Sequence, residues 1–243
     1  MNFAPVLVTY NIRIGLDGPL AAVGDALAGL APDVVCLQEV GVRWQMGEPV
    51  DQPAVLAARL GLPFVAFAGA LTDARGGRFG VAILSRRAFR TTSFTLLPRA
   101  ADEQRVLLQV VLDTTPALHV WTTHLSIFEA EREDQARRVR EELARCPGPA
   151  LLAGDFNDGP GSATLAILRG ATLADGSPLV DVFDACGTGD PLTFSVRAPN
   201  RRIDYVLAGG GLGAGPTRVA REVTASDHFP VVTRVEATGV TLA

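Results

Sequence analysis

Short apolar runs separated by polar turns dominate the first half of the chain. Residues 6–10 and 34–38 are almost continuously apolar, a pattern typical of strands that are buried on both faces. Further runs of β-branched or alternating residues also predict strands, and the last three of them resemble a meander. These further strands are expected at residues 64–68, 79–84, 91–97, 105–112 and 118–123.

Three segments have the composition of helices instead. Residues 19–30 are rich in alanine and leucine, and Asp17 is the candidate cap. Residues 52–60 also fit a helix. Residues 129–145 carry charges of interleaved sign, which suits a helix that faces solvent and is stabilised by pairs four residues apart.

The second half adds three strands, at residues 150–153, 203–207 and 229–235. We interpret the glycine-rich residues 209–215 as a loop, because Pro216 follows and no helix begins there. So many strands require two sheets, with the helices on their outer faces.

Composition sets the class of protein. The 243 residues are 48% hydrophobic, which is enough for a sizeable core, and we expect residues 1–243 to form one domain. No apolar stretch approaches the roughly 20 residues that cross a bilayer, and no basic leader precedes the first strand. Cys36, Cys146 and Cys186 are widely spaced and odd in number, which favours buried, reduced thiols over disulfides. We therefore expect a monomer in the cytoplasm.

The charged residues exclude several chemistries. All 22 basic residues are arginine, so lysine-dependent phosphate loops, kinases and Schiff-base enzymes are excluded. The net charge of −4 has the wrong sign for holding nucleic acid by bulk electrostatics. It is compatible with a carboxylate cluster to which bound divalent cations bring a phosphate.

The candidate chemistry lies where predicted strands end. Asp155 and Asn157 follow an apolar strand in the run Gly-Asp-Phe-Asn; a carboxylate there can bind a hard cation, and an amide can contact an oxyanion without changing charge. Comparable strand-end clusters recur along the chain. They are Tyr10-Asn11, Gln38-Glu39, Thr123-His124, Ile203-Asp204-Tyr205 and Ser226-Asp227-His228.

Each of these clusters also has a plain structural interpretation. Asn11 could be an ordinary turn residue, and Glu39 could lie in solvent. Asp155 with Asn157 could form a side-chain-to-backbone turn. A lone histidine is more often packing than chemistry, and we interpret His119, within a strand pattern, as structural or exposed.

His228 is the histidine with the strongest chemical case. An imidazole that acts on a proton needs a carboxylate on one nitrogen to fix its tautomer, and Asp204 can serve if the two strands meet. The chain has no Gly-x-Ser-x-Gly nucleophile motif and no zinc spacing of histidine and cysteine. Carboxylate and amide ligands without thiols favour Mg²⁺, or Mn²⁺, over zinc.

In this order, the clusters resemble those of the endonuclease/exonuclease/phosphatase superfamily, the DNase I-like metal-dependent phosphoesterases. The resemblance runs from Asn11 to His228. It implies a four-layer α/β/β/α sandwich, in which two mixed sheets pack face to face with helices outside. That architecture agrees with the two sheets expected from the pattern.

The resemblance also implies roles for individual residues. Glu39 would be a principal Mg²⁺ ligand with Asn11 beside it, and Asp227 would complete the metal edge. Asp155 would contribute to the same metal edge. Together with Asn157, it would also act on the attacking water or on the charged transition state.

The same resemblance assigns three roles around the phosphate. His228, oriented by Asp204, would be the general base or an equivalent group that contacts the phosphate. His124 would hydrogen-bond a phosphate oxygen, although no carboxylate partner for it is evident from the motifs. Arg105 and Arg202 are the candidate substrate-binding arginines.

We therefore expect a Mg²⁺-dependent phosphodiesterase, broadly nuclease-like, that acts on a phosphoester, with nucleic acid among the candidate substrates. A phosphomonoesterase or a lipid- or inositol-headgroup phosphatase on the same fold is the alternative, because the fold does not fix the substrate. A catalytically silent binding module is the third interpretation.

Overall fold

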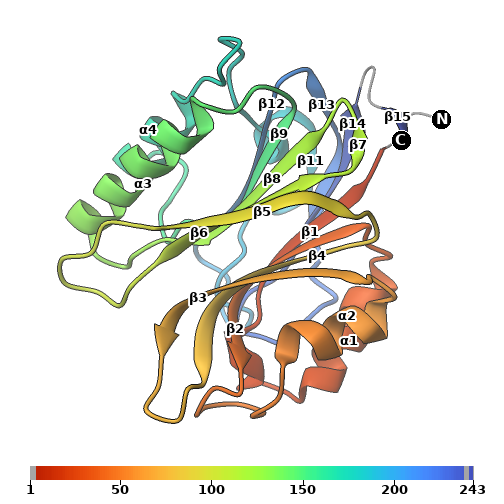
Figure 1. Ribbon diagram of the computed structural model, residues 1–243, viewed down its shortest axis with the longest axis vertical. Coiled ribbons are helices and arrows are strands. Elements are labelled where there is room, and N and C mark those ends of the chain that lie inside the picture. Colours follow the sequence, from red (N-terminus) through yellow and green to blue (C-terminus); the bar gives the residue numbers. More distant parts are fainter. Residues whose placement is uncertain (1–3, 238–240, 243) are drawn as a thin grey trace.

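The computed structural model describes residues 4–237 and 241–242 as two β-sheets that pack face to face (Figure 1). The first sheet has seven strands in the order β11-β13-β14-β1-β2-β4-β3 and mixes parallel with antiparallel pairs. Its strands are β1 (Val6–Asn11), β2 (Val34–Val42), β3 (Phe64–Thr72), β4 (Arg78–Ser85), β11 (Gly187–Thr188), β13 (Leu212–Val219) and β14 (Val231–Ala237).

The second sheet has six strands in the order β10-β12-β9-β8-β6-β5. Its strands are β5 (Phe89–Leu96), β6 (Val106–Leu112), β8 (Leu118–His124), β9 (Ala150–Asp155), β10 (Val180–Asp181) and β12 (Asp204–Gly209). The short strands β7 (Thr114–Thr115) and β15 (Thr241–Leu242) pair with each other.

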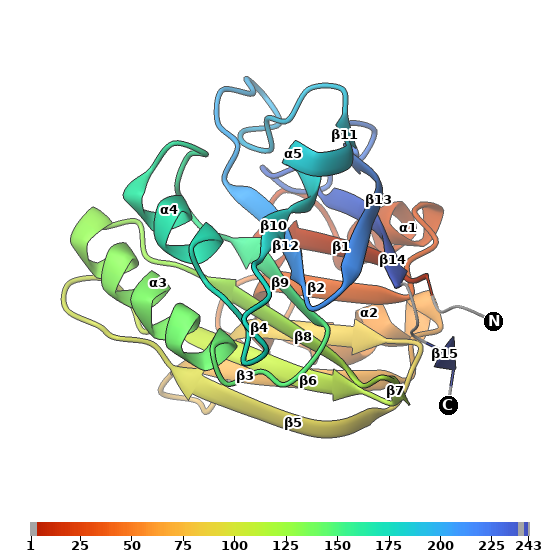
Figure 2. The same ribbon diagram turned by 90° about the horizontal axis from the view of Figure 1, so that it is seen from above.

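Helices cover the outer face of each sheet. Figure 1 shows α1 (Leu20–Gly29) and α2 (Gln52–Leu60) against the first sheet, and α3 (Glu129–Leu143) and α4 (Ala163–Arg169) against the second. The short helix α5 (Val182–Cys186) lies beside β13, at the edge of the molecule opposite β5 (Figure 2). The expected four-layer α/β/β/α sandwich is thus confirmed. Within the described ranges, no helix is both long enough and apolar enough to cross a membrane.

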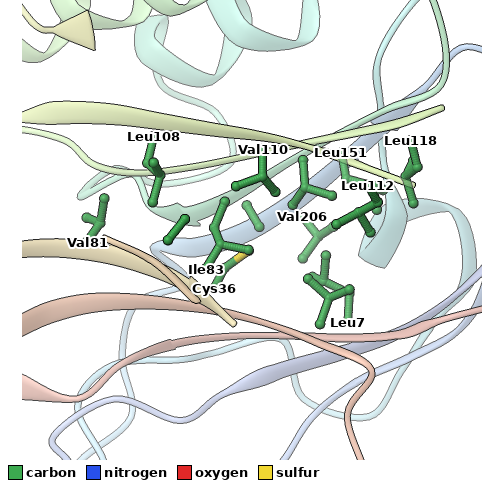
Figure 3. Packing of buried hydrophobic residues seen from close by; sticks show 14 of the residues in the cluster. Leu7, Cys36, Val81, Ile83, Leu108, Val110, Leu112, Leu118, Leu151 and Val206 are labelled. Atoms are coloured by element: carbon green, nitrogen blue, oxygen red, sulfur yellow. The ribbon is translucent and has the colours of Figure 1, made fainter. Parts of the chain in front are cut away.

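The main core lies between the two sheets. Figure 3 shows Leu108, Val110 and Leu151 of the second sheet facing Val81 and Ile83 of the first. Burial of this continuous aliphatic surface on two facing sheets is the dominant stabilising contribution to such a sandwich. A polar contact crosses the core near one end: Gln38 Nε2 donates to Thr122 Oγ1 at 2.9 Å, which joins β2 to β8.

Four details differ from the expectations. Residues 212–215 belong to β13, and only Gly210 and Gly211, both with positive φ, make the turn from β12. The amide of Leu20 at the start of α1 donates to the Glu48 carboxylate, whereas Asp17 pairs with Arg13. The short helices α4 and α5 were not expected. Cys36 and Cys146 are buried, but Cys186 is exposed; all three are free thiols.

Candidate active site

Strand register brings the predicted side chains to one end of the sandwich. β8 and β9 are parallel, with His124 opposite Asp155, and β12 runs antiparallel to β9, with Asp204 also opposite Asp155. In the first sheet, the parallel strands β1 and β2 end at the same edge, where Asn11 lies opposite Gln38. Residues far apart in sequence therefore meet in a cleft of about 530 Å³.

Asp155 is at the centre of this cleft and is buried. Its Oδ2 accepts from Asn11 Nδ2 at 3.1 Å, while its Oδ1 accepts the backbone N–H of Asn157 at 2.9 Å. Burial, together with repulsion from the Asp204 carboxylate, raises the pKa of Asp155 to about 7. A carboxylate whose pKa lies near neutrality can exchange a proton with water during a reaction.

Gly154 allows β9 to deliver Asp155 to this position. Its φ is +153°, and a Cβ built on it would lie 2.0 Å from the carbonyl oxygen of Thr123 on β8. Any side chain here would push β9 away from its parallel neighbour. Close approach of β8 therefore requires a glycine immediately before Asp155.

Glu39 was expected at the end of its strand. It lies instead inside β2, at a β-bulge. Its φ is +50°, and the register with β4 shifts between Gln38 and Val40. A bulge re-aims one side chain, and a non-glycine residue held at positive φ stores strain that often marks a functional position. The bulge turns the Glu39 carboxylate into the cleft.

Asn11 joins the two acidic groups. Its Nδ2 donates to Glu39 Oε1 at 2.9 Å as well as to Asp155, while its Oδ1 accepts the backbone N–H of Arg13 at 3.0 Å. The atom that faces the carboxylates is therefore a donor. In this arrangement Asn11 positions Glu39 and Asp155 for a cation and is not itself a ligand.

His228 and Asp204 form the expected pair. Nδ1 of His228 lies 2.9 Å from Asp204 Oδ2, and its Nε2 lies 3.7 Å from Asp155 Oδ2. Burial opposes a charge on the ring, but the carboxylates of Asp204 and Asp155 outweigh it and raise the pKa of His228 to about 10. The imidazole is therefore held as a cation near neutral pH.

His124 is in the opposite protonation state. Burial, reinforced by repulsion from Arg105 and His228, holds the pKa of His124 well below its usual 6.5. Asn157 Nδ2 lies 2.9 Å from both Leu125 O and His124 Nε2. Because the Leu125 carbonyl must face the NH₂ group, Nε2 is the acceptor, and neutral His124 orients Asn157 instead of donating through Nε2 to a phosphate.

The three remaining predicted residues are placed differently from one another. Asp227 and Arg105 line the cleft; Arg105 Nη2 pairs with Asp102 at 3.0 Å, and its buried Nε has no partner among the described residues. Arg202 is outside the cleft, its Nη1 held by Asp184 at 2.7 Å. The expectation that Arg202 binds a substrate phosphate does not fit this arrangement.

Sequence patterns missed Phe194, whose ring centroid lies 4.8 Å from that of His228. The Arg201 guanidinium also lies over the Phe194 ring, 4.5 Å from its centroid. No motif marks Phe194. The alternation of an extended segment could have indicated that adjacent Arg201 and Arg202 point to different surroundings.

The donors in the cleft fit a hard divalent cation. Glu39 and Asp155 bond the same Asn11 nitrogen, so their oxygens converge, and Asp227 lines the same cleft. Within the described part of the chain, ligand atoms of Asp155, Asp204 and His228 also lie within 4.8 Å of one another. Asp204 already bonds His228, and both oxygens of Asp155 accept hydrogen bonds, so Glu39, with Asp155 beside it, is the carboxylate that could hold an ion such as Mg²⁺.

Comparison with known proteins agrees with this geometry. Residues 8–228 match the model of the Endonuclease/Exonuclease/phosphatase family. The YbhP protein of Escherichia coli (strain K12) is 27% identical over 256 residues, covering 95% of each chain.

Two solved structures illustrate the shared fold. An endonuclease/exonuclease/phosphatase from Beutenbergia cavernae superposes with a TM-score of 0.81 at 26% identity, over 96% of this chain and 72% of that one. A mannosyl-6-phosphatase from Bacteroides thetaiotaomicron superposes with a TM-score of 0.74 at 18% identity, over 95% and 98% of the two chains.

Proposed function

Because the chain belongs to the endonuclease/exonuclease/phosphatase family, we propose that it is a Mg²⁺-dependent phosphodiesterase that hydrolyses its substrate by attack of water. One observation carries this proposal: Asp155 is surrounded, within one cleft, by the Asn11–Glu39 pair and the His228–Asp204 pair. The first can hold a cation, and the second, in which Asp204 balances the imidazolium charge of His228, holds a proton donor in a fixed orientation. Attack on a phosphodiester requires both close together.

Glu39 would be the principal ligand of the ion, with Asp155 and Asp227 at the same edge of the cleft; Mn²⁺ suits the same oxygens. When bound, the cation neutralises negative charge on the phosphate oxygens and on the departing oxygen. The carboxylates of Glu39, Asp155 and Asp204 leave the cleft rich in acid, so an anionic substrate depends on that cation.

The chain's own residues supply the remaining functions. As the water oxygen bonds to phosphorus and the bond to the leaving oxygen breaks, the water proton passes to Asp155. His228, charged and fixed by Asp204, hydrogen-bonds a phosphate oxygen and can return a proton to the leaving group. Asn157 Nδ2 is committed to His124 and the Leu125 carbonyl, so its Oδ1 is the group left to accept from, and orient, the attacking water.

The space on both sides of this centre favours a diester over a monoester. The catalytic cleft meets a second cavity, of about 770 Å³, and the two share Ile127, Asn157, Arg201 and Ile203. A phosphorus atom at Asn157 would have room for one alcohol on each side. A monoester would leave one of the two spaces unused.

The second candidate is a phosphomonoesterase. The mannosyl-6-phosphatase shares the fold. The buried Nε of Arg105, without a protein partner among the described residues, could donate a hydrogen bond to the additional negative charge of a monoester dianion.

We further infer a cytoplasmic monomer, because all three cysteines are free and the exposed Cys186 thiol would be oxidised outside a reducing compartment.

Hydrolysis of chromogenic esters tests the proposal. We expect release of p-nitrophenolate from bis-p-nitrophenyl phosphate with Mg²⁺ or Mn²⁺, its loss in EDTA, and slower release from p-nitrophenyl phosphate. Turnover of the monoester alone would replace the proposal with the second candidate. No turnover of either ester, with a melting temperature that Mg²⁺ still raises, would indicate a silent binding module.

A further inference from the structure

The cavity beside the catalytic cleft has no role in the chemistry described above. It is about 770 Å³ in volume, larger than the cleft itself, and lies beyond Asn157. The loop after β9 forms one wall with Gly159 and Pro160, and α5 contributes Phe183. Small-molecule sites have volumes of roughly 300–1,000 Å³ and few polar groups among apolar ones. This cavity has the size and the mixed lining of such a site.

Two of the three arginines on its wall are already neutralised. Arg132 pairs with Asp158 at 3.0 Å, and Arg202 is held by two aspartates. Arg201 has no carboxylate partner among the described residues, and its guanidinium rests on the Phe194 ring. The positive charge that remains for a ligand therefore belongs to Arg201.

Arg201 lies at the junction of the two spaces, because it lines both of them. Beside it, the side chain of Asn200 has no hydrogen-bond partner within the described residues. A guanidinium pairs with phosphate or carboxylate in a two-point geometry, and an amide contacts a neutral polar group. Leu192 and Phe183 supply apolar surface on the same cavity.

The arginines of the cleft do not form a track for a polynucleotide. Arg13 pairs with Asp17 at 3.1 Å, and Arg105 pairs with Asp102 and Glu103. A nucleic-acid groove needs a series of cations that neutralise successive phosphates. A single available guanidinium next to one bounded cavity fits one additional anionic group.

We propose that this cavity binds the alcohol part of a small phosphodiester, a compact group with a ring and a second anionic substituent that Arg201 recognises. The proposal rests on the proposed function and identifies the class of its substrate. Two nucleoside esters serve as probes. Both release p-nitrophenolate, and only one carries a second anion: thymidine 5′-(p-nitrophenyl phosphate) and its 3′-phosphorylated form.

Kinetics of the Arg201→Gln variant test whether the Arg201 guanidinium recognises the second anionic group. The wild-type protein with Mg²⁺ should have the higher kcat/KM for the 3′-phosphorylated ester, and the ratio of the two values should fall by about tenfold or more in Arg201→Gln. Arg197→Gln is the matched control, since Arg197 is exposed on the same segment but lines neither space. Equal values for the two esters in the wild type, or an unchanged ratio in Arg201→Gln, would overturn the proposal.

A glycine pair tests the cavity itself. Gly159 and Gly161 both have open space around a built Cβ, but only Gly159 lines the cavity. Gly159→Phe should raise KM for both nucleoside esters several-fold more than KM for methyl p-nitrophenyl phosphate. Gly161→Phe should change KM for the three esters by the same factor. A Gly159→Phe protein that behaves like Gly161→Phe would show that the cavity is not used.

A binding measurement separates this proposal from the proposed function. If the wild type hydrolyses none of the esters, the phosphodiesterase proposal fails by itself. Calorimetric titration with thymidine 3′,5′-bisphosphate still tests the cavity: binding about tenfold weaker in Arg201→Gln than in Arg197→Gln supports it, and equal binding in the two variants contradicts it.

Discussion

Two clusters of acidic and basic side chains differ in their balance of charge. In the first, whose Asp184 and Arg202 line the second cavity, Asp181 and Asp184 share two arginines: Arg169 Nη2 lies 2.6 Å from Asp181 and 2.7 Å from Asp184, and Arg202 bonds both. The Arg202 guanidinium also lies 4.9 Å from the ring centroid of Phe183 and 4.6 Å from that of Tyr205. This cluster has as many cations as anions, and aromatic rings cover part of it.

The catalytic cluster has an excess of acid instead. Asp155, Asp204 and Glu39 have one cation in direct contact, the imidazolium of His228, and the pKa of Asp155 is raised because burial and Asp204 disfavour its charge. A balanced buried network holds the fold together, whereas an unbalanced one is prepared to bind a cation and to move a proton. The two clusters should therefore respond to the same mutation in opposite ways.

Removal of the central carboxylate should have the largest effect on activity. Asp155→Ala should lower kcat for bis-p-nitrophenyl phosphate by about 10²–10⁴-fold, because the group that accepts the water proton is lost. The fold should be retained, since removing Asp155 relieves repulsion by Asp204. Steady-state kinetics and thermal melting measure the two effects.

Asp175→Ala, in an exposed turn, is the control and should change neither kcat nor the melting temperature. If Asp155→Ala unfolds the protein, the cleft is a structural cluster and the comparison between the two sites fails.

Removal of the corresponding carboxylate from the balanced cluster should reduce stability instead. Asp181→Ala breaks the buried pair with Arg202, which keeps only the half-exposed Asp184, and removes the cap of α5, so we expect a loss of about 3–5 kcal/mol in the free energy of unfolding. At temperatures where the variant is folded, kcat should stay within a few-fold of the wild type. Urea denaturation gives the free energy.

Asp184→Ala provides the comparison within the same network. About half of the Asp184 side chain is exposed, so solvent screens its pairs and the loss should be about 1 kcal/mol or less. Equal losses for Asp181→Ala and Asp184→Ala would show that burial does not set the strength of this network.

The sequence allowed the sandwich and the residues of the cleft to be predicted, because both are encoded locally. Apolar runs mark the strands, and the polar residues at their ends are adjacent to those runs, as Asp155 is to residues 150–153. The pairing of His228 with Asp204 was stated as a condition, and the distance of 2.9 Å between His228 Nδ1 and Asp204 Oδ2 meets it.

Other features depend on contacts that no local pattern contains. The donor orientation of Asn11 follows from the backbone N–H of Arg13, and the bulge at Glu39 follows from its pairing with β4. The burial of Arg202 requires Asp181 and Asp184, about 20 residues away on elements of two and five residues. Such short elements have too few positions to show periodicity.

Glu131 extends the comparison between the two clusters. It is a buried carboxylate that, among the described residues, neither pairs with an arginine, as Asp181 does, nor lies in the catalytic cleft, as Asp155 does. Its Oε2 accepts the backbone N–H groups of Ala100, Ala101 and Asp102 at 2.7, 2.6 and 3.2 Å. Burial would raise the pKa of Glu131, but these donors outweigh it and lower the pKa below its usual 4.5. Here backbone dipoles, and not a cation, stabilise the charge.

Glu131→Gln should therefore lower the free energy of unfolding at pH 7 by about 1–3 kcal/mol, since a neutral amide oxygen accepts the three bonds more weakly than a carboxylate oxygen does. The contribution of an acid whose pKa is lowered by folding is present above its unfolded pKa and is lost as the pH falls through the folded value. The difference in the free energy of unfolding between the wild type and Glu131→Gln should thus shrink as the pH falls below 4.5. Urea denaturation at pH 7 and pH 4 measures this difference.

Glu133→Gln is the control. Glu133 is on the same helix and pairs with Arg137, so its loss should lower the free energy of unfolding by less than about 1 kcal/mol. A Glu131→Gln loss that is the same at both pH values would mean that packing around the side chain, and not its charge, holds residues 100–102 in place.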